Sequence, residues 1–252
     1  MNLHTLRATA LAGLLFPLLS LAGQPLDVEI YDRKTGRVLP VYWHEGERHI
    51  AGEPGHEYEI RIRNHGHGRV LAVTSVDGVN VITGRTASPD QSGYVLDPYG
   101  RVEIDGWRKS MDEVAAFYFT ALPDSYAART GRPDNVGVIG VALFRELVFT
   151  AALERESAAA ADAAPSPAQK SAGRTAGGLR EESRLGTGHG QRLDSGAVYT
   201  QFERASETPD ELIRIYYDSC RNLVARGVIP RPHDRYARRP PDPFPQGFVP
   251  DP

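Results

Sequence analysis

Residues 56–63 alternate strictly between apolar and charged side chains. Tyr58, Ile60 and Ile62 fall on one side of an extended backbone, and glutamates and arginines fall on the other. Successive side chains of a β-strand point to opposite faces, so this pattern predicts a strand with one buried face and one wet face. Strands of this kind are typical of antiparallel sheets, whose outer faces meet solvent.

Short stretches with strand patterns recur along the first half of the chain, separated by turn signals rather than helices. Asp77-Gly78, between two valines, is a strong hairpin signal because a type I′ turn requires positive φ at both central residues. Regular short strands predict an all-β fold over residues 26–149, an antiparallel β-sandwich that is Ig-like or jelly-roll-like. The expected strands are 26–31, 38–43, 56–63, 70–76, 94–96, 102–104, 114–120 and 136–144.

Two segments of the C-terminal half have the composition of disordered chain. Residues 157–184 are rich in Ala, Pro, Ser and Gly and lack apolar periodicity, which predicts a disordered linker. Residues 230–252 are dense in proline and basic residues, which predicts an extended or disordered tail.

Between these segments, residues 185–229 regain an apolar pattern. Strands at 198–204 and 212–217 are expected to form a hairpin, followed by a short helix that Asp218 or Ser219 caps. This piece is too small to bury a core of its own. We therefore expect the hairpin and helix to pack on the sandwich and cover a sheet edge or an open face.

Residues 1–22 have the features of an export signal. Arg7 supplies a positive start, residues 8–21 are almost wholly apolar, and Ser20-Leu21-Ala22 offers small residues to a signal peptidase. The apolar run is short for a membrane span, and no second such run follows. We expect a signal peptide at 1–22, no transmembrane segment after its cleavage, and a periplasmic or secreted protein; an uncleaved N-terminal anchor is the alternative.

Charge and cysteine content exclude several classes. The formal net charge is −3, with both signs mixed along the chain, so the basic field of a nucleic-acid binder is missing and no nucleic-acid partner is expected. Cys220 is the one cysteine, so an intramolecular disulfide is impossible and stability must come from a core. We expect Cys220 itself to be a small buried group rather than a nucleophile.

The glycine-rich stretch RLGTGHGQR, residues 184–192, invites a phosphate-binding interpretation that its details exclude. No Gly-Lys-Ser/Thr follows, as a P-loop requires, and Gln191 stands where a dinucleotide fingerprint needs its third glycine. We expect the glycines to permit positive φ or close backbone contact where the chain re-enters the fold. The alternative is a hydrolase in which His189 is the acid or base beside Asp194 or Ser195. No nucleophile or metalloprotease motif supports it, and no cofactor is expected.

Histidines cluster in the first part of the chain. His65 and His67 flank one glycine and are the candidate ligands of a periplasmic metal-binding protein, the second alternative. No cysteine partner, methionine cluster or helical histidine pair accompanies them. His44, His49 and His56 belong to the same cluster, and the chain between His44 and His56 is expected to be an exposed hairpin.

The densest unusual stretch is GWRKS, followed closely by DSYAARTG. Its candidate binding residues are Trp107, Arg108, Lys109, Tyr126 and Arg129. Aromatic and cationic side chains together can form a surface for sugars or a protein partner. In the alternative interpretation Trp107, Phe117 and Phe119 belong to the core and Arg108 is a solvated neighbour.

The stretches VLAVTSVDGVNVITG, GWRKS, AAFYFTALPDSYAARTGRPDNVGVIGVALFRE, GTGHG and YYDSCRNLVARGVI resemble an uncharacterised family of exported bacterial proteins with no known activity. The resemblance covers most of 58–146 and 185–229, and implies that the C-terminal piece belongs with the sandwich. The leading hypothesis is an exported non-enzymatic protein that acts through a surface, binding an envelope protein or a glycan.

Overall fold

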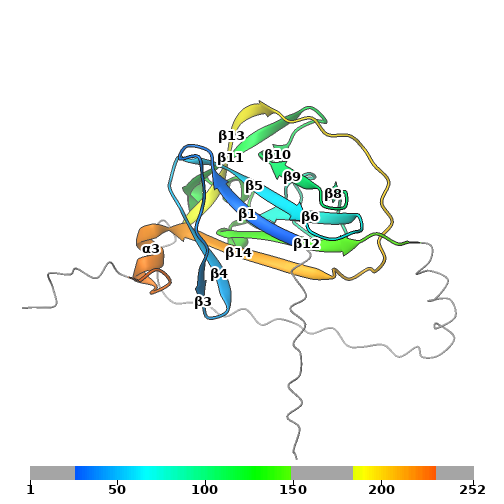
Figure 1. The fold of residues 1–252 in the computed structure, drawn as a ribbon. Coiled ribbons are helices and arrows are strands. Elements are labelled where there is room, and N and C mark those ends of the chain that lie inside the picture. The colour runs from blue at the N-terminus through cyan, green and yellow to red at the C-terminus, as the bar shows by residue number, and fades with distance from the viewer. Residues whose placement is uncertain (1–25, 149–183, 231–252) are drawn as a thin grey trace, which may run out of the picture.

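The computed structural model describes residues 26–148 and 184–230, which form two facing β-sheets with few helices (Figure 1). The expected signal peptide, nearly all of the linker and nearly all of the tail lie outside these residues. The all-β, sandwich-like fold predicted from the alternation is confirmed. No helix among the described residues is long and apolar enough to cross a membrane.

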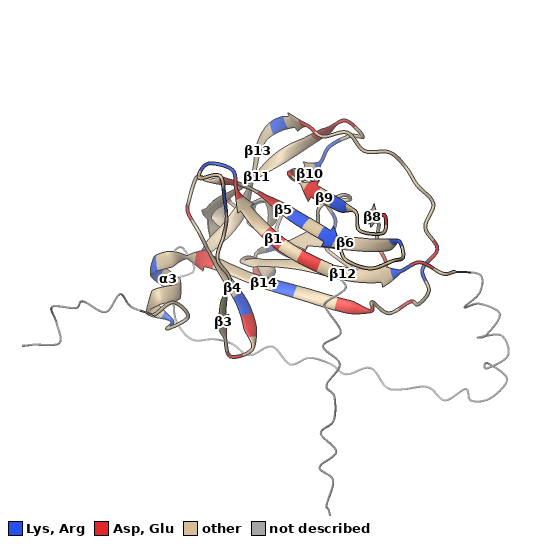
Figure 2. Cartoon of the chain, viewed as in Figure 1, with Lys and Arg blue, Asp and Glu red and all other residues tan. Residues whose placement is uncertain are grey.

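Sheet A has the strand order β10-β11-β5-β1-β2, with β13 pairing β11 and β9 pairing β5. Its strands are β1 (Leu26–Asp32), β2 (Arg37–Val38), β5 (Glu57–Asn64), β9 (Arg101–Ile104), β10 (Gly106–Arg108), β11 (Glu113–Ala121) and β13 (Leu185–Asp194). Tyr58, Ile60 and Ile62 of β5 are buried, as their alternation predicts. Figure 2 shows basic and acidic residues interspersed along the same strand and its neighbour β1.

Sheet B has the order β3-β4-β14-β12-β6-β7, with β8 pairing β6. Its strands are β3 (Tyr42–His44), β4 (Glu47–Gly52), β6 (Val70–Val76), β7 (Val79–Asn80), β8 (Tyr94–Leu96), β12 (Val138–Arg145) and β14 (Glu211–Ser219). One pair, β14 with β4, is parallel, so the sheet is mixed rather than purely antiparallel. Asp77 and Gly78 have positive φ between β6 and β7, as expected of the Asp-Gly turn.

Within residues 26–148 and 184–230, four short helices lie beside the two sheets: η1 (Leu122–Asp124), α1 (Tyr126–Arg129), η2 (Pro133–Asn135) and α3 (Cys220–Ala225). Helix α3 is the expected short C-terminal helix, and the Ser219 side chain caps it by accepting from the Asn222 N–H. Cys220 is exposed rather than buried, because it lies at the first position of α3 while Leu223 makes the core contact.

The two C-terminal strands do not form the expected hairpin. β13 joins sheet A beside β11, and β14 lies in sheet B between β4 and β12. Residues 198–204 contain no strand, and Val198 and Tyr199 are 88% and 92% exposed. The segment instead makes an isolated bridge between Arg204 and Glu146 and packs Phe202 against the small cluster around Phe144, and its other side chains stay at the surface.

The expected strand at 38–43 is also divided. Val38 ends β2 in sheet A, Tyr42 begins β3 in sheet B, and Pro40 lies in the crossing between them. A proline lacks the N–H that a continuous ladder would need, so the chain leaves one sheet here and enters the other.

The glycine-rich stretch forms most of strand β13, and none of its glycines has positive φ. Of the two roles expected for these glycines, positive φ or close backbone contact, the structure shows close backbone contact. A Cβ on Gly186 would lie 2.6 Å from the Ser125 Cβ and 2.7 Å from a Val136 methyl carbon. The missing side chain therefore lets β13 approach the segment that carries α1 and η2.

Candidate functional site

The predicted Trp107 surface lies partly in the core. Trp107 is 3% exposed, its ring packs edge-on against Phe117 at 5.1 Å, and its Nε1 donates to the Gly188 carbonyl at 3.2 Å. Phe117 and Phe119 are fully buried. The structure thus places Trp107 where the core interpretation put it, and its ring has no face for a ligand.

Three other members of that surface, Lys109, Tyr126 and Arg129, come together around His189. Tyr126 lies against Trp107, with ring centroids 4.8 Å apart, and stacks on the exposed His189 at 5.7 Å. Lys109 and Arg129 are exposed beside this pair. Arg108 instead turns inward, where its guanidinium donates to the Ser195 carbonyl and, at 3.0 Å, to the Tyr94 hydroxyl.

His189 does not meet the residues expected to make it catalytic. Asp194 lies opposite Glu113 at the far end of β13, and the Ser195 carbonyl and hydroxyl contact Arg108. Burial lowers the pKa of His189, and the nearby cations, among them Lys109 and Arg129, lower it further. The ring is therefore a neutral, exposed imidazole within a positive environment.

His65 and His67 are both exposed in the turn between β5 and β6. The His67 ring makes an edge contact with Tyr99, at 5.2 Å between centroids, and a hydrogen bond to its hydroxyl. Within residues 26–148 and 184–230, no group of three or more His, Cys, Asp or Glu side chains is arranged to hold a metal ion.

His56 provides the closest approach to a catalytic pair, with Asp32 as its partner. The His56 Nδ1 lies 2.8 Å from the Asp32 Oδ2, at a hollow lined also by Thr35 and Arg37. Burial raises the pKa of Asp32, but hydrogen bonds from His56 and from two backbone N–H groups outweigh it, so the net shift is downward. Among the described residues, the His56 ring makes no hydrogen bond to a hydroxyl or thiol. The His56–Asp32 pair therefore links the β1–β2 turn to the loop before β5.

Asp77 is the most deeply buried carboxyl, and it connects the two sheets. Its carboxylate accepts from the Gly137 N–H at 2.9 Å, from the Thr187 N–H at 2.8 Å, and from the Tyr217 hydroxyl. The Thr187 hydroxyl in turn bonds those of Tyr217 and Tyr58, at 2.7 and 2.6 Å. Burial raises the pKa of Asp77 to about 6, against these hydrogen bonds, which lower it. With every member enclosed, this network is structural.

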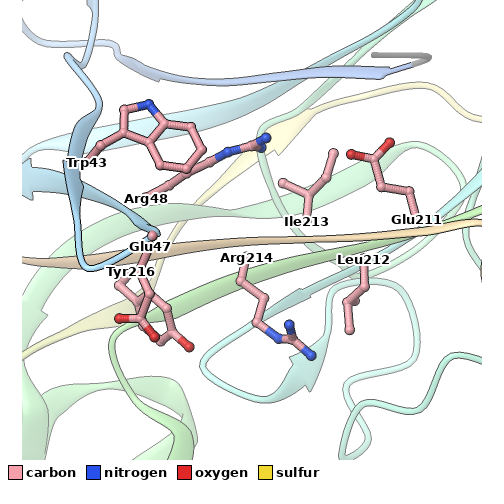
Figure 3. Close-up of a pocket in the computed structure, with 9 residues that line it drawn as sticks. Trp43, Glu47, Arg48, Glu211, Leu212, Ile213, Arg214 and Tyr216 are labelled. Atoms are coloured by element: carbon pink, nitrogen blue, oxygen red, sulfur yellow. The ribbon is translucent and has the colours of Figure 1, made fainter. Parts of the chain in front are cut away.

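The site that the sequence did not reveal is a hollow of about 240 Å³ at the start of β14 (Figure 3). Trp43, 64% exposed on β3, stands beside it with the Arg48 guanidinium 5.2 Å from its ring. Trp43, Arg48 and Glu211 lie on one side of β14, and Leu212 and Arg214 lie on the other. The YWHEGE stretch carries the usable signal, a tryptophan beside the hairpin turn Glu45-Gly46, where it must be exposed.

The hollow exists because β14 starts before its neighbour does. The β14–β4 register begins at Ile215 opposite Arg48, and β4 starts only one residue earlier, at Glu47, so residues 211–213 extend past the start of β4. The Tyr217 N–H donates to the carbonyl of Gly137, the residue just before β12. Because backbone groups alternate in direction along a strand, the odd-numbered residues of β14 direct their N–H and C=O groups toward β12, and the even-numbered residues direct theirs away from it. The N–H of Arg214 and both backbone groups of Leu212 therefore face the hollow, with no described strand beside them.

One further polar group at the hollow has no partner. The Oε2 atom of Glu211 is shielded from solvent and makes no hydrogen bond with the described part of the chain. A shielded carboxylate oxygen without a donor is costly, and a ligand that brings a donor removes that cost. We name the hollow and these open backbone groups the β14 notch, defined by Trp43, Arg48, Glu211, Leu212 and Arg214.

Comparisons of the chain with protein-family models, with curated proteins and with solved structures found no match.

Proposed function

We propose that this protein is an exported, non-enzymatic binding protein that holds an extended segment of an envelope protein in the β14 notch. The observation that carries the proposal is the unpaired edge of β14 at Leu212 and Arg214, next to an exposed tryptophan. Added strands bind through main-chain hydrogen bonds to such an edge, and side-chain pockets on alternate residues supply selectivity.

The side chains around the notch indicate what the segment should carry. An added strand places alternate side chains on the two sides of the sheet. On one side an apolar residue would cover the ring of Trp43 and a basic residue would reach Glu211; on the other, Leu212 is 43% exposed and offers a second apolar contact. The expected ligand is a short segment with an apolar and a basic residue two positions apart.

A glycan is the other ligand class that Trp43 suggests, because an exposed aromatic ring can stack on a sugar. The open N–H of Arg214 and the open N–H and C=O of Leu212 favour the peptide, since their spacing matches a strand rather than a sugar ring. The hydrolase alternative has less support, because His189 has neither Asp194 nor Ser195 beside it.

Selection from a displayed library of random peptides tests this proposal, with the full chain as bait. We expect selected peptides to bind Trp43→Ala at least about tenfold more weakly, since a central aromatic anchor commonly contributes this much. Tyr199→Ala, which removes a 92% exposed aromatic residue elsewhere, is the matched control and should bind normally. N-methylation of the peptide amides that point toward β14 should abolish binding, and N-methylation of the alternate amides, which point away from it, should not.

Two results would overturn the proposal. One is the finding that oligosaccharides bind to the protein and lose affinity in Trp43→Ala, while no selected peptide binds through Trp43. The other is a selected peptide whose binding is insensitive both to Trp43→Ala and to N-methylation, which would place it outside the notch.

A further inference from the structure

A second surface, separate from the β14 notch, surrounds the stacked rings of Tyr126 and His189. The rings come from α1 and β13, and the pair rests on Trp107 of β10. Because the Trp107 Nε1 is bonded to the Gly188 carbonyl, the base of the stack is fixed to the strand that carries His189. The outermost ring is that of His189, which is exposed.

The charged groups around the stack are mostly cations. Lys109 follows β10, Arg129 ends α1, and Arg192 lies on β13; all three act on His189 as positive charges. Arg132 places its guanidinium 6.0 Å from the Tyr126 ring centroid and is held by the Gly84 carbonyl and the Thr130 hydroxyl. Arg192 is already paired, with the Glu113 carboxylate at 2.7 Å.

Two of these cations are available to a ligand. The side chains of Lys109 and Arg129 make no hydrogen bond or ion pair with any described residue, and both are exposed. Exposed cations that flank an aromatic ring attract an anion, and the ring supplies a flat apolar contact between them.

We propose that this surface, made by His189, Tyr126, Lys109 and Arg129, binds an anionic glycan. A sugar ring covers the exposed face of His189, and its carboxylates pair with Lys109 and Arg129. A sugar chain is the occupant we favour, because the centre of the surface is a flat aromatic ring between two cations. The outer edge of β13 pairs with no described strand, so an acidic peptide is the competing ligand that the experiment below tests. This site does not depend on the peptide ligand proposed for the β14 notch.

Isothermal titration of the full chain with an oligogalacturonate at low salt tests the assignment. We expect binding that weakens as salt is raised, with Lys109→Ala/Arg129→Ala lowering affinity about tenfold or more. His189→Ala should lower it several-fold, and Trp43→Ala should leave it unchanged. The matched control is Arg101→Ala, an exposed cation on the outer face of sheet A.

A second readout distinguishes a bound anion from a general charge effect. An anion beside His189 favours the imidazolium, so the NMR titration midpoint of His189 should rise in the complex, and affinity should increase as pH falls. The proposal is overturned if maltohexaose, a neutral sugar, binds as well, if a poly-glutamate peptide of equal charge binds more tightly, or if Arg101→Ala weakens binding as much as the double variant. Absence of binding at millimolar oligogalacturonate also overturns it.

Discussion

Strands β13 and β14 belong to the same C-terminal segment, yet they enter the fold for opposite reasons. β13 fits beside β11 and α1 because Gly186 lacks a side chain. β14 fits in sheet B because Ile213, Ile215 and Tyr217 fill the core. One strand is specified by absent side chains and the other by apolar periodicity, and only the second leaves a signal that alternation can detect.

The largest expected effect comes from removing a buried apolar side chain of β14. Ile215 is 1% exposed, so Ile215→Ala leaves a cavity and should lower the free energy of unfolding by about 2–5 kcal/mol. Leu212→Ala, on the same strand but 43% exposed, should cost far less. Urea unfolding of both variants measures the difference, and equal losses would contradict the placement of β14.

Adding a side chain at a glycine of β13 should also destabilise the protein. Gly186→Ala places a Cβ against the buried Ser125 and Val136, and overpacking of this kind costs about 1–3 kcal/mol. The control is Gly196→Ala, where a Cβ would meet nothing within 4 Å. A Gly186→Ala protein as stable as the control in thermal unfolding would show that β13 does not approach α1 closely.

Asp77 joins the two strands, through the Thr187 N–H of β13 and the Tyr217 hydroxyl of β14. The folded-state pKa of Asp77 is about 6, above its ordinary value of 3.8. Its contribution to stability is therefore fully present below about pH 4 and is lost as pH rises through 6, by up to about 3 kcal/mol.

Unfolding of the native chain and of Asp77→Asn across this pH range measures that contribution. The neutral Asn offers one acceptor oxygen where the carboxylate has two, so the variant should be less stable throughout. The gap should be wider at pH 4 than at pH 8. If the stability difference between the native chain and Asp77→Asn widened as pH rises, it would contradict the burial of the Asp77 carboxyl group between the two strands.

The smallest expected effect lies at the junction of β4 and β14. His49 is 1% exposed, stacks on Tyr216, and neither ring nitrogen has a hydrogen-bond partner in the described chain. Burial and then Arg226 lower the pKa of His49, so its contribution to stability is lost as pH falls below about 6.5. His49→Phe keeps the stacking and removes this dependence, so it should gain stability over the native chain at pH 5 more than at pH 8.

The sequence predicted the strands whose alternation is strong, such as those containing Tyr58 to Ile62, and the turn at Asp77-Gly78. It did not predict β13, because glycines carry no periodicity, nor which sheet β14 would join, because alternation identifies a buried face and not a neighbour. His49 was expected on an exposed hairpin; it lies on the hairpin, but the outward ring of Tyr216 covers it. Tyr126, Lys109 and Arg129, which the sequence suggested as binding residues, lie together around His189, while Trp107 is buried beneath Tyr126.

The β14 notch was missed for a related reason. Trp43 was placed inside one long strand at 38–43, whereas Pro40 divides that segment and leaves Trp43 on a hairpin beside an open edge. Only the register between β4 and β14 shows that the edge is open.

Amide hydrogen exchange along β14 in the free protein tests that open edge most directly. If the edge is open, the N–H groups of Leu212 and Arg214 exchange rapidly while those of Ile213 and Ile215, directed toward β12, are strongly protected. Equal protection of all four amides would show that another segment already pairs with this edge, and would contradict the binding site proposed for it.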